Sequence, residues 1–196
     1  MKRIPIILCI LLFVTPCLAN QIIIGKKKAA ASCSVDTNEV GYRAEGSSNT
    51  TPTAERFYCN LFTPDCSGKL YTAYLYHYST GAANAKVCVY EDDGDSNPDS
   101  GDDLVICSGA IASGSSAGWK TDTLASNPAV ATGTNYWLCI ISDSTAWAYI
   151  HTGGIAQKYL VQEGAYASPP ATLDPGAGSW GNVSDRSVSV YMTVGD

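Results

Sequence analysis

The densest group of side chains that could do chemistry lies between Glu91 and Asp103, where seven of thirteen residues are acidic. Hard cations such as Ca²⁺ take about six to eight oxygen ligands, and aspartates that alternate around a glycine can supply them. The spacing is similar to that of the EF-hand loop but does not match it, since no glutamate closes the loop and no flanking helices are predicted. The sequence therefore favours either a structural Ca²⁺ site or a solvated hairpin loop. The candidate ligands are Asp93, Asp95, Asn97, Asp99 and Asp102.

Aromatic residues form the second group, because exposed rings can stack on sugar rings while polar loops bind the sugar hydroxyls. The candidate binding residues near predicted turns are Trp119, Trp147, Tyr149, Tyr166 and Trp180. Tyr74, Tyr76 and Tyr78 alternate along one face of a predicted strand. The alternative interpretation is that such rings fill a core or pair across strands.

Catalytic signatures are weak in this chain. The stretch from Gly114 to Gly118 fits the Gly-x-Ser-x-Gly pattern of a nucleophile turn, but it lies in Gly/Ser-rich sequence with no helix after it. His77 and His151 are the only histidines, and their spacing does not suggest a metal pair. No pair of carboxylates on a strand suggests glycoside hydrolysis. We expect no enzymatic activity, with a secreted hydrolase as the alternative.

The first 19 residues have the features of a secretory signal peptide. Lys2 and Arg3 precede an apolar run from Ile4 to Val14, and Ala19 ends a small-residue cleavage site. The run is too short to span a membrane, and no other segment is long and apolar enough. We therefore expect no membrane span and a bacterial protein that is secreted or held at the cell surface.

Residues 20–37 are expected to form a leader before the folded domain. Ile22, Ile23 and Ile24 make a short β-prone segment ahead of three lysines. This segment is either a solvated linker or a donor strand that completes the sheet of a neighbouring subunit. An exposed run of isoleucines would otherwise promote aggregation.

The charge of the chain limits its partners. The formal net charge is −6, and removal of Lys2 and Arg3 with the signal peptide makes it more negative. Nucleic acids and anionic membranes bind basic surfaces, so we expect neither as a partner. The expected partners are further copies of the chain, or a surface glycan or protein.

Six of the eight cysteines lie outside the signal peptide. An even number of cysteines in an exported chain favours disulfides. Cys59 and Cys66 flank a short loop that contains a proline, while Cys88 and Cys107 end two apolar strands. The expected bridges are Cys59–Cys66, Cys88–Cys107 and Cys33–Cys139. The alternative is that Cys88 and Cys139 are small buried hydrophobic residues without a bridge.

Short strands with frequent turns must position these groups. Tyr136–Ile141 has two apolar faces, which predicts a central strand that is covered on both sides. In the strand Lys69–Tyr78, strict alternation places Leu70 on the same face as Tyr74 and Tyr76. The alternation in Ser187–Val194 turns its valines and Met192 inward.

The stretches Trp147–His151 and Lys158–Val161 are expected to pair as a hairpin around two glycines. About eight or nine short strands and no amphipathic helix predict an all-β fold. The expected architecture is a single domain over residues 38–196, an antiparallel β-sandwich of jelly-roll type.

Several short motifs resemble those of exported bacterial and phage-associated β-sandwich modules. The matching pieces are Ala85–Asp92, Asn97-Pro98, Leu104-Val105, Gly118-Trp119, Gly133–Leu138 and Ser189–Tyr191. The resemblance covers roughly residues 57–194, and its motifs are structural. It implies a jelly-roll β-sandwich of the surface, tail-fibre or carbohydrate-contacting type.

These observations favour a non-catalytic extracellular β-sandwich that acts by contact. One form is an adhesion or glycan-binding module that uses loop aromatics, with Ca²⁺ stiffening the acidic hairpin. The other form is a self-assembling filament subunit that donates residues 21–25 to its neighbour's sheet.

Overall fold

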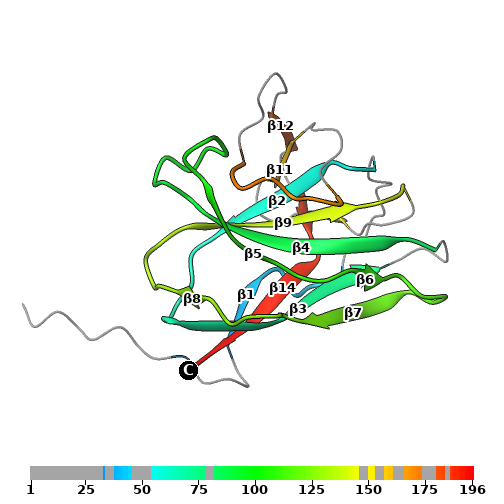
Figure 1. The fold of residues 1–196 in the computed structure, drawn as a ribbon, viewed down its shortest axis with the longest axis horizontal. Coiled ribbons are helices and arrows are strands. Elements are labelled where there is room, and N and C mark those ends of the chain that lie inside the picture. Colours follow the sequence, from blue (N-terminus) through cyan, green and yellow to red (C-terminus); the bar gives the residue numbers. More distant parts are fainter. Residues whose placement is uncertain are drawn as a thin grey trace, which may run out of the picture.

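The computed structural model describes residues 33, 38–45, 54–77, 82–145, 150–152, 157–160, 166–173, 180–183 and 186–196. All regular elements in these ranges are strands, and all but two of them form two antiparallel sheets that lie one above the other (Figure 1). The all-β, two-sheet prediction is therefore confirmed. The predicted signal peptide and Ile22–Ile24 lie outside the described residues. Within those residues, no helix is long and apolar enough to cross a membrane.

The larger sheet has the strand order β12-β11-β2-β9-β4-β5, and β6 also pairs with β4. Its strands are β2 (Phe57–Phe62), β4 (Asn84–Glu91), β5 (Asp103–Cys107), β6 (Ile111–Ala112), β9 (Tyr136–Ser142), β11 (Gln157–Leu160) and β12 (Trp180–Val183). The smaller sheet has the order β1-β14-β3-β7, and β8 also pairs with β3. Its strands are β1 (Asn38–Gly41), β3 (Gly68–His77), β7 (Gly118–Thr123), β8 (Ala129–Val130) and β14 (Val190–Gly195).

A third, two-stranded sheet joins β10 (Ile150–Thr152) to β13 (Arg186–Val188). β11 instead pairs with β2 on one side and β12 on the other. The predicted hairpin of residues 147–151 with residues 158–161 is therefore wrong. Each of these two strands finds its partner in a distant part of the chain rather than in its neighbour.

Strand β9 is the centre of the larger sheet, as the sequence predicts. It lies between β2 and β4, and all seven of its residues are buried. Tyr136, Leu138 and Ile140 pack into the layer between the two sheets. Trp137 and Cys139 pack into a second apolar layer on the outer face of the larger sheet.

The layer between the sheets is the main core. Val87 and Leu138 of the larger sheet pack with Leu75 and Met192 of the smaller sheet, and all four side chains are fully buried. Full burial of one such side chain contributes about 1.5–3 kcal/mol. The inward orientation predicted for Met192 and the valines of β14 is confirmed.

The second apolar layer is covered by a segment that we call the strap, residues Tyr166–Leu173. Leu173 is fully buried in this layer beside Trp137 and Tyr90. The Tyr90 hydroxyl donates a hydrogen bond to the Pro170 carbonyl (3.1 Å). The Lys86 ammonium donates one to the Tyr166 carbonyl (2.9 Å). Both faces of the larger sheet are thus shielded from water near β9.

Strand β3 departs from the predicted alternation. Its register with β14 shifts between Met192 and Val194, so that Tyr71 and Thr72 together oppose one residue, Thr193. This β-bulge reverses the faces on either side of it. Leu70 is therefore buried in the main core with Ala73 and Leu75, rather than on the face of Tyr74.

The disulfides are Cys33–Cys66, Cys59–Cys139 and Cys88–Cys107. The last of these confirms the prediction, whereas the predicted Cys59–Cys66 and Cys33–Cys139 bridges are wrong. Cys59 belongs to the outer apolar layer and Cys66 to the main core, so the two thiols lie on opposite faces of the larger sheet. Cys33, which lies within the predicted leader, is therefore tied to the turn between β2 and β3.

Candidate functional site

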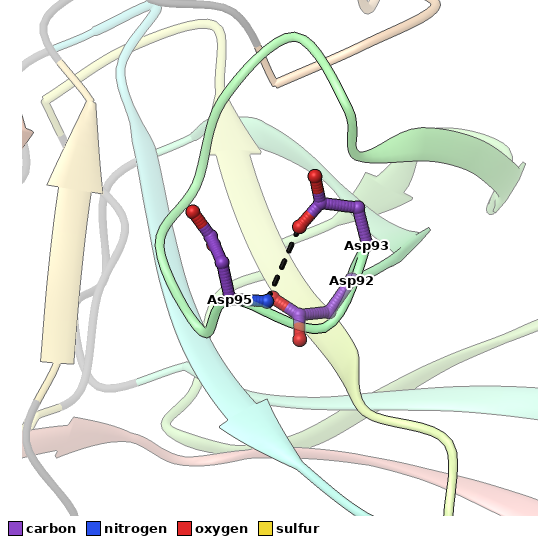
Figure 2. A group of neighbouring side chains, drawn as sticks. All are labelled: Asp92, Asp93 and Asp95. Carbon is purple, nitrogen blue, oxygen red and sulfur yellow. Dashed lines mark hydrogen bonds between the residues drawn. The ribbon is translucent and has the colours of Figure 1, made fainter.

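The acidic loop, residues 92–102, connects β4 to β5 at one end of the sandwich. Figure 2 shows Asp92, Asp93 and Asp95 together on this loop, with the backbone N–H of Asp95 hydrogen-bonded to Asp93. Oxygens of the three carboxylates lie within 4.8 Å of one another. Asp93 and Asp95 are exposed, whereas only 6% of Asp92 is exposed.

Asp92 connects the acidic loop to the central strand. One of its oxygens accepts a hydrogen bond from the indole nitrogen of Trp137 (3.2 Å). The other accepts from Asn135 (3.4 Å) and from the backbone N–H of Gly94 (3.2 Å). A carboxylate is tolerated at this depth because several donors surround it.

Asp102 is fully buried at the other end of the loop. Its two oxygens accept hydrogen bonds from the backbone N–H groups of Asp93 (3.2 Å) and Asp99 (2.9 Å). Burial raises the pKa of this carboxyl to about 6, although these two hydrogen bonds oppose the rise. The negative charges of Asp92 and Asp99 add to the increase in the pKa.

The predicted calcium ligands are divided by this geometry. Asp93 and Asp95 lie together with Asp92, which the sequence analysis did not select. Asp95 and Asp99 accept backbone hydrogen bonds from Asn97 and Gly101 (each 2.6 Å). The loop is folded by its own carboxylates, and the predicted Ca²⁺ ion stays a prediction.

A cluster of rings lies on the solvent side of the smaller sheet. We call Tyr74, Tyr76, Trp119 and Tyr191 the aromatic face. Register places Tyr74 opposite Tyr191 and Tyr76 opposite Trp119. The three rings on β3 and β7 are partly exposed, and Tyr191 lies beneath them with 5% of its surface exposed.

The rings of the aromatic face contact each other in two ways. Tyr74 and Tyr191 are stacked, with ring centres 4.4 Å apart and planes 5° from parallel. Trp119 makes edge contacts to Tyr191 (5.0 Å) and Tyr76 (5.3 Å). These pairs hold one another in position, because offset and edge-to-face arrangements are the favoured aromatic geometries.

Polar groups surround the aromatic face. Arg43 lies over the Tyr191 ring (5.6 Å) and also contacts the Glu39 carboxylate (2.6 Å). Burial raises the pKa of Tyr191, and the charge of Glu39 adds to that rise while Arg43 opposes it. Thr121 is exposed on β7 directly opposite Tyr74. Rings, hydroxyls and a guanidinium are thus available on one sheet surface.

Of the predicted binding residues, the two whose side chains are described, Trp119 and Tyr166, lie on opposite sides of the sandwich. Trp119 belongs to the aromatic face, together with Tyr74 and Tyr76. Tyr166 packs on the outer face of the larger sheet, where the Lys86 ammonium lies 4.9 Å from its ring centre. Trp147, Tyr149 and the side chain of Trp180 lie outside the described residues.

Tyr191 is the residue of the aromatic face that the sequence analysis did not select. Its neighbours on β14, Val190 and Met192, point into the main core, whereas Tyr191 points outward. An outward direction alone did not suggest a role for this residue. The register between β14 and β3 shows that Tyr191 lies beside Tyr74, and this pairing joins strands that are far apart in the sequence.

Searches against known protein families and curated proteins find no family model and no relative that matches this chain.

Proposed function

We propose that this chain is a non-catalytic extracellular protein, a β-sandwich of jelly-roll type, which binds carbohydrate through the aromatic face. The observation that carries the proposal is the gathering of Tyr74, Tyr76, Trp119 and Tyr191 on the solvent side of one sheet. Large rings at such positions leave apolar surface in water, which is unfavourable unless a ligand covers it.

The chemistry of the aromatic face suits a sugar better than a purely apolar ligand. The C–H groups of a pyranose ring can pack on an aromatic surface, while its hydroxyls need hydrogen-bonding partners nearby. The hydroxyls of Thr121 and Thr123, on the same face of β7 as Trp119, are close enough in register to serve. The proposed ligand is therefore a neutral glycan.

The export of the chain is supported by two independent features. The sequence predicts a signal peptide at residues 1–19, and the structure contains three disulfides, which persist in oxidising compartments. A bacterial surface or secreted protein fits both. Filament assembly through Ile22–Ile24 remains a separate prediction, since these residues lie outside the described part of the chain.

Glycan-array screening followed by calorimetry on Trp119→Ala tests the proposal. Loss of the indole removes a partly exposed ring that contacts both Tyr191 and Tyr76, and we expect at least about a tenfold loss of affinity, or about 1.4 kcal/mol. Tyr166→Ala is the matched control, because it removes a partly exposed ring from the opposite side of the sandwich.

If Trp119→Ala binds the glycan as tightly as the wild type does, the glycan binds elsewhere on the protein. If only Tyr166→Ala loses binding, the glycan binds at the strap. Absence of binding to every glycan by the folded, disulfide-bonded protein would remove carbohydrate as the ligand.

A further inference from the structure

Four cysteines stand in a row across the larger sheet. Cys59 of β2 is directly opposite Cys139 of β9, Cys139 is directly opposite Cys88 of β4, and Cys88 is directly opposite Cys107 of β5. We call these four residues the cysteine row. The two outer pairs are bridged, and the central pair, Cys139 and Cys88, is not.

Antiparallel geometry explains which pairs are bridged. The N–H and C=O of a residue point to the same neighbouring strand, so each residue makes a close pair on one side and a wider, hydrogen-bonded pair on the other. Both bridged pairs have Cα atoms 4.0 Å apart, as close pairs do. The Ser108 N–H donates to the Val87 carbonyl (2.8 Å), so Val87 and Ser108 form a hydrogen-bonded pair. Cys88 and Cys107, the next pair along these two strands, are therefore a close pair.

The central pair, Cys139 and Cys88, is therefore of the wider type. Cα atoms in hydrogen-bonded pairs are about 5.5 Å apart, a separation within the range of protein disulfides. A bridge can move to this pair without a change of strand register, with the two strands closing locally by about 1 Å so that the Cβ atoms come within about 4.5 Å of each other. All four side chains also share the same face of the sheet, because they occupy matching register positions.

The two ends of the cysteine row differ in exposure. Cys107 is partly exposed at strand β5, whereas Cys59, Cys88 and Cys139 are fully buried in the outer apolar layer. A thiol reagent in solution can therefore approach the row at Cys107 only. Apolar burial raises the pKa of a thiol, which slows its reaction but does not prevent exchange with an adjacent disulfide.

We propose that the cysteine row is a thiol–disulfide relay, which transmits reduction at Cys107 to the buried Cys59. A thiolate of an external dithiol attacks the sulfur of Cys107, and the electron pair of the broken bond leaves on Cys88. The Cys88 thiolate then attacks the sulfur of Cys139, forms a Cys88–Cys139 bridge and expels Cys59 as a thiolate, which takes up a proton.

The second thiol of the dithiol then attacks the mixed disulfide and releases Cys107 as a thiol. In total, one protein disulfide is reduced to two thiols and the dithiol is oxidised to a cyclic disulfide. The bridge that remains in the row joins β9 to β4, so β2 and β5 both lose their disulfide attachment to the neighbouring strand, and Cys33–Cys66 is unaffected. The acidic loop runs from β4 to β5, so its β4 end stays attached to the bridged pair while its β5 end loses the disulfide attachment.

Cys107→Ser isolates the exchange step, because it leaves a Cys88 thiol beside the Cys59–Cys139 bridge without any reductant. The purified variant is quenched in acidic denaturant, where exchange stops because thiols are not deprotonated, and its now accessible thiols are alkylated with a maleimide that still reacts at mildly acidic pH before digestion. We expect the alkylation mass shift on Cys59 as well as Cys88, together with a Cys88–Cys139 linked peptide. Cys88→Ser is the matched control, since its free thiol on Cys107 has no second bridge opposite it, and only Cys107 should be labelled.

Label on Cys88 alone in folded Cys107→Ser, with Cys59–Cys139 intact, overturns the proposal. If circular dichroism shows that the variant does not fold, the wild type decides. After limiting dithiothreitol and acid quenching, the relay requires label on Cys59 and Cys107 with a Cys88–Cys139 bridge. Label on Cys88 and Cys107 with an intact Cys59–Cys139 bridge again overturns it.

Discussion

Buried carboxylates determine the character of the acidic loop. Asp92 accepts hydrogen bonds from the central strand, and Asp102 accepts them from the loop's own backbone. The two groups are held at depth by donors rather than by a positively charged side chain. The loop is therefore sensitive to protonation, and Asp102 is the group whose pKa moves toward neutrality.

Asp102 should make stability depend on mildly acidic pH. Its pKa is about 6 in the folded state and about 3.9 in the unfolded chain, so the folded state holds the proton more tightly. Stability should therefore fall as pH rises from about 4 to about 6, by about 1–3 kcal/mol in total. Urea unfolding at several pH values in this range measures the decrease in the wild type. Asp102→Asn should show no such decrease.

Asp95→Asn is the control for Asp102→Asn. It removes an exposed carboxylate that also accepts a backbone hydrogen bond in the same loop. Its unfolding free energy should follow the wild type through this pH range. Parallel pH profiles for the wild type and Asp102→Asn would show that another group is responsible.

Residue composition was enough to locate the acidic loop, but not to rank its aspartates. Asp92 and Asp93 are adjacent in sequence, yet one is buried and the other exposed. The difference arises from Trp137, which lies 45 positions away and donates its indole N–H to Asp92. A local pattern contains no information about such a partner.

At the scale of elements, β1 depends on one close approach to its neighbour. Gly41 ends this strand with φ of 113°, a conformation that side chains rarely adopt. A Cβ at this position would lie 2.5 Å from the Val190 carbonyl oxygen and 2.6 Å from a methyl group of Leu138. The glycine allows β1 to lie against β14 above the main core.

Gly41→Ala should destabilise the protein by at least about 3 kcal/mol, since backbone strain adds to a clash with fixed atoms. Gly94→Ala is the matched control, because its φ of 107° is similar and nothing lies within 4 Å of the added Cβ. That variant should lose only about 1–2 kcal/mol. Urea unfolding measures both, and equal losses would show that the contact at Gly41 relaxes without cost.

Elements with an uninterrupted pattern could be predicted from the sequence. Strand β9 has two apolar faces and is buried on both, and β14 turns its alternate apolar residues inward. Strand β3 was assigned its faces wrongly, because a bulge at Tyr71 and Thr72 leaves no trace in hydropathy. The partners of β10 and β11 were also missed, since their pairing depends on strands far along the chain.

At the scale of the whole molecule, the sandwich and its general class followed from strand number and turn frequency. The disulfide pairing did not, apart from Cys88–Cys107, whose two strands are neighbours in both sequence and space. Cys59 and Cys66 are near each other in sequence, but the sheet separates them. The disulfide connectivity therefore depends on which face of the folded sheet each cysteine occupies, and not on the spacing of the cysteines in the sequence.

The overlap of two bridges determines how the molecule should respond to tension. From Cys33 to Cys139 the polypeptide is 139 − 33 = 106 residues long, but the covalent route through Cys33–Cys66 and Cys59–Cys139 includes only 66 − 59 = 7 of them. At about 3.6 Å per residue, force can stretch this part to a length of at most roughly 25 Å, rather than roughly 380 Å after reduction. Optical tweezers measure both lengths, and identical extensions with and without reductant would contradict the overlapping bridges. The two bridges therefore limit the extension of the segment between Cys33 and Cys139 even after its sheets have unfolded.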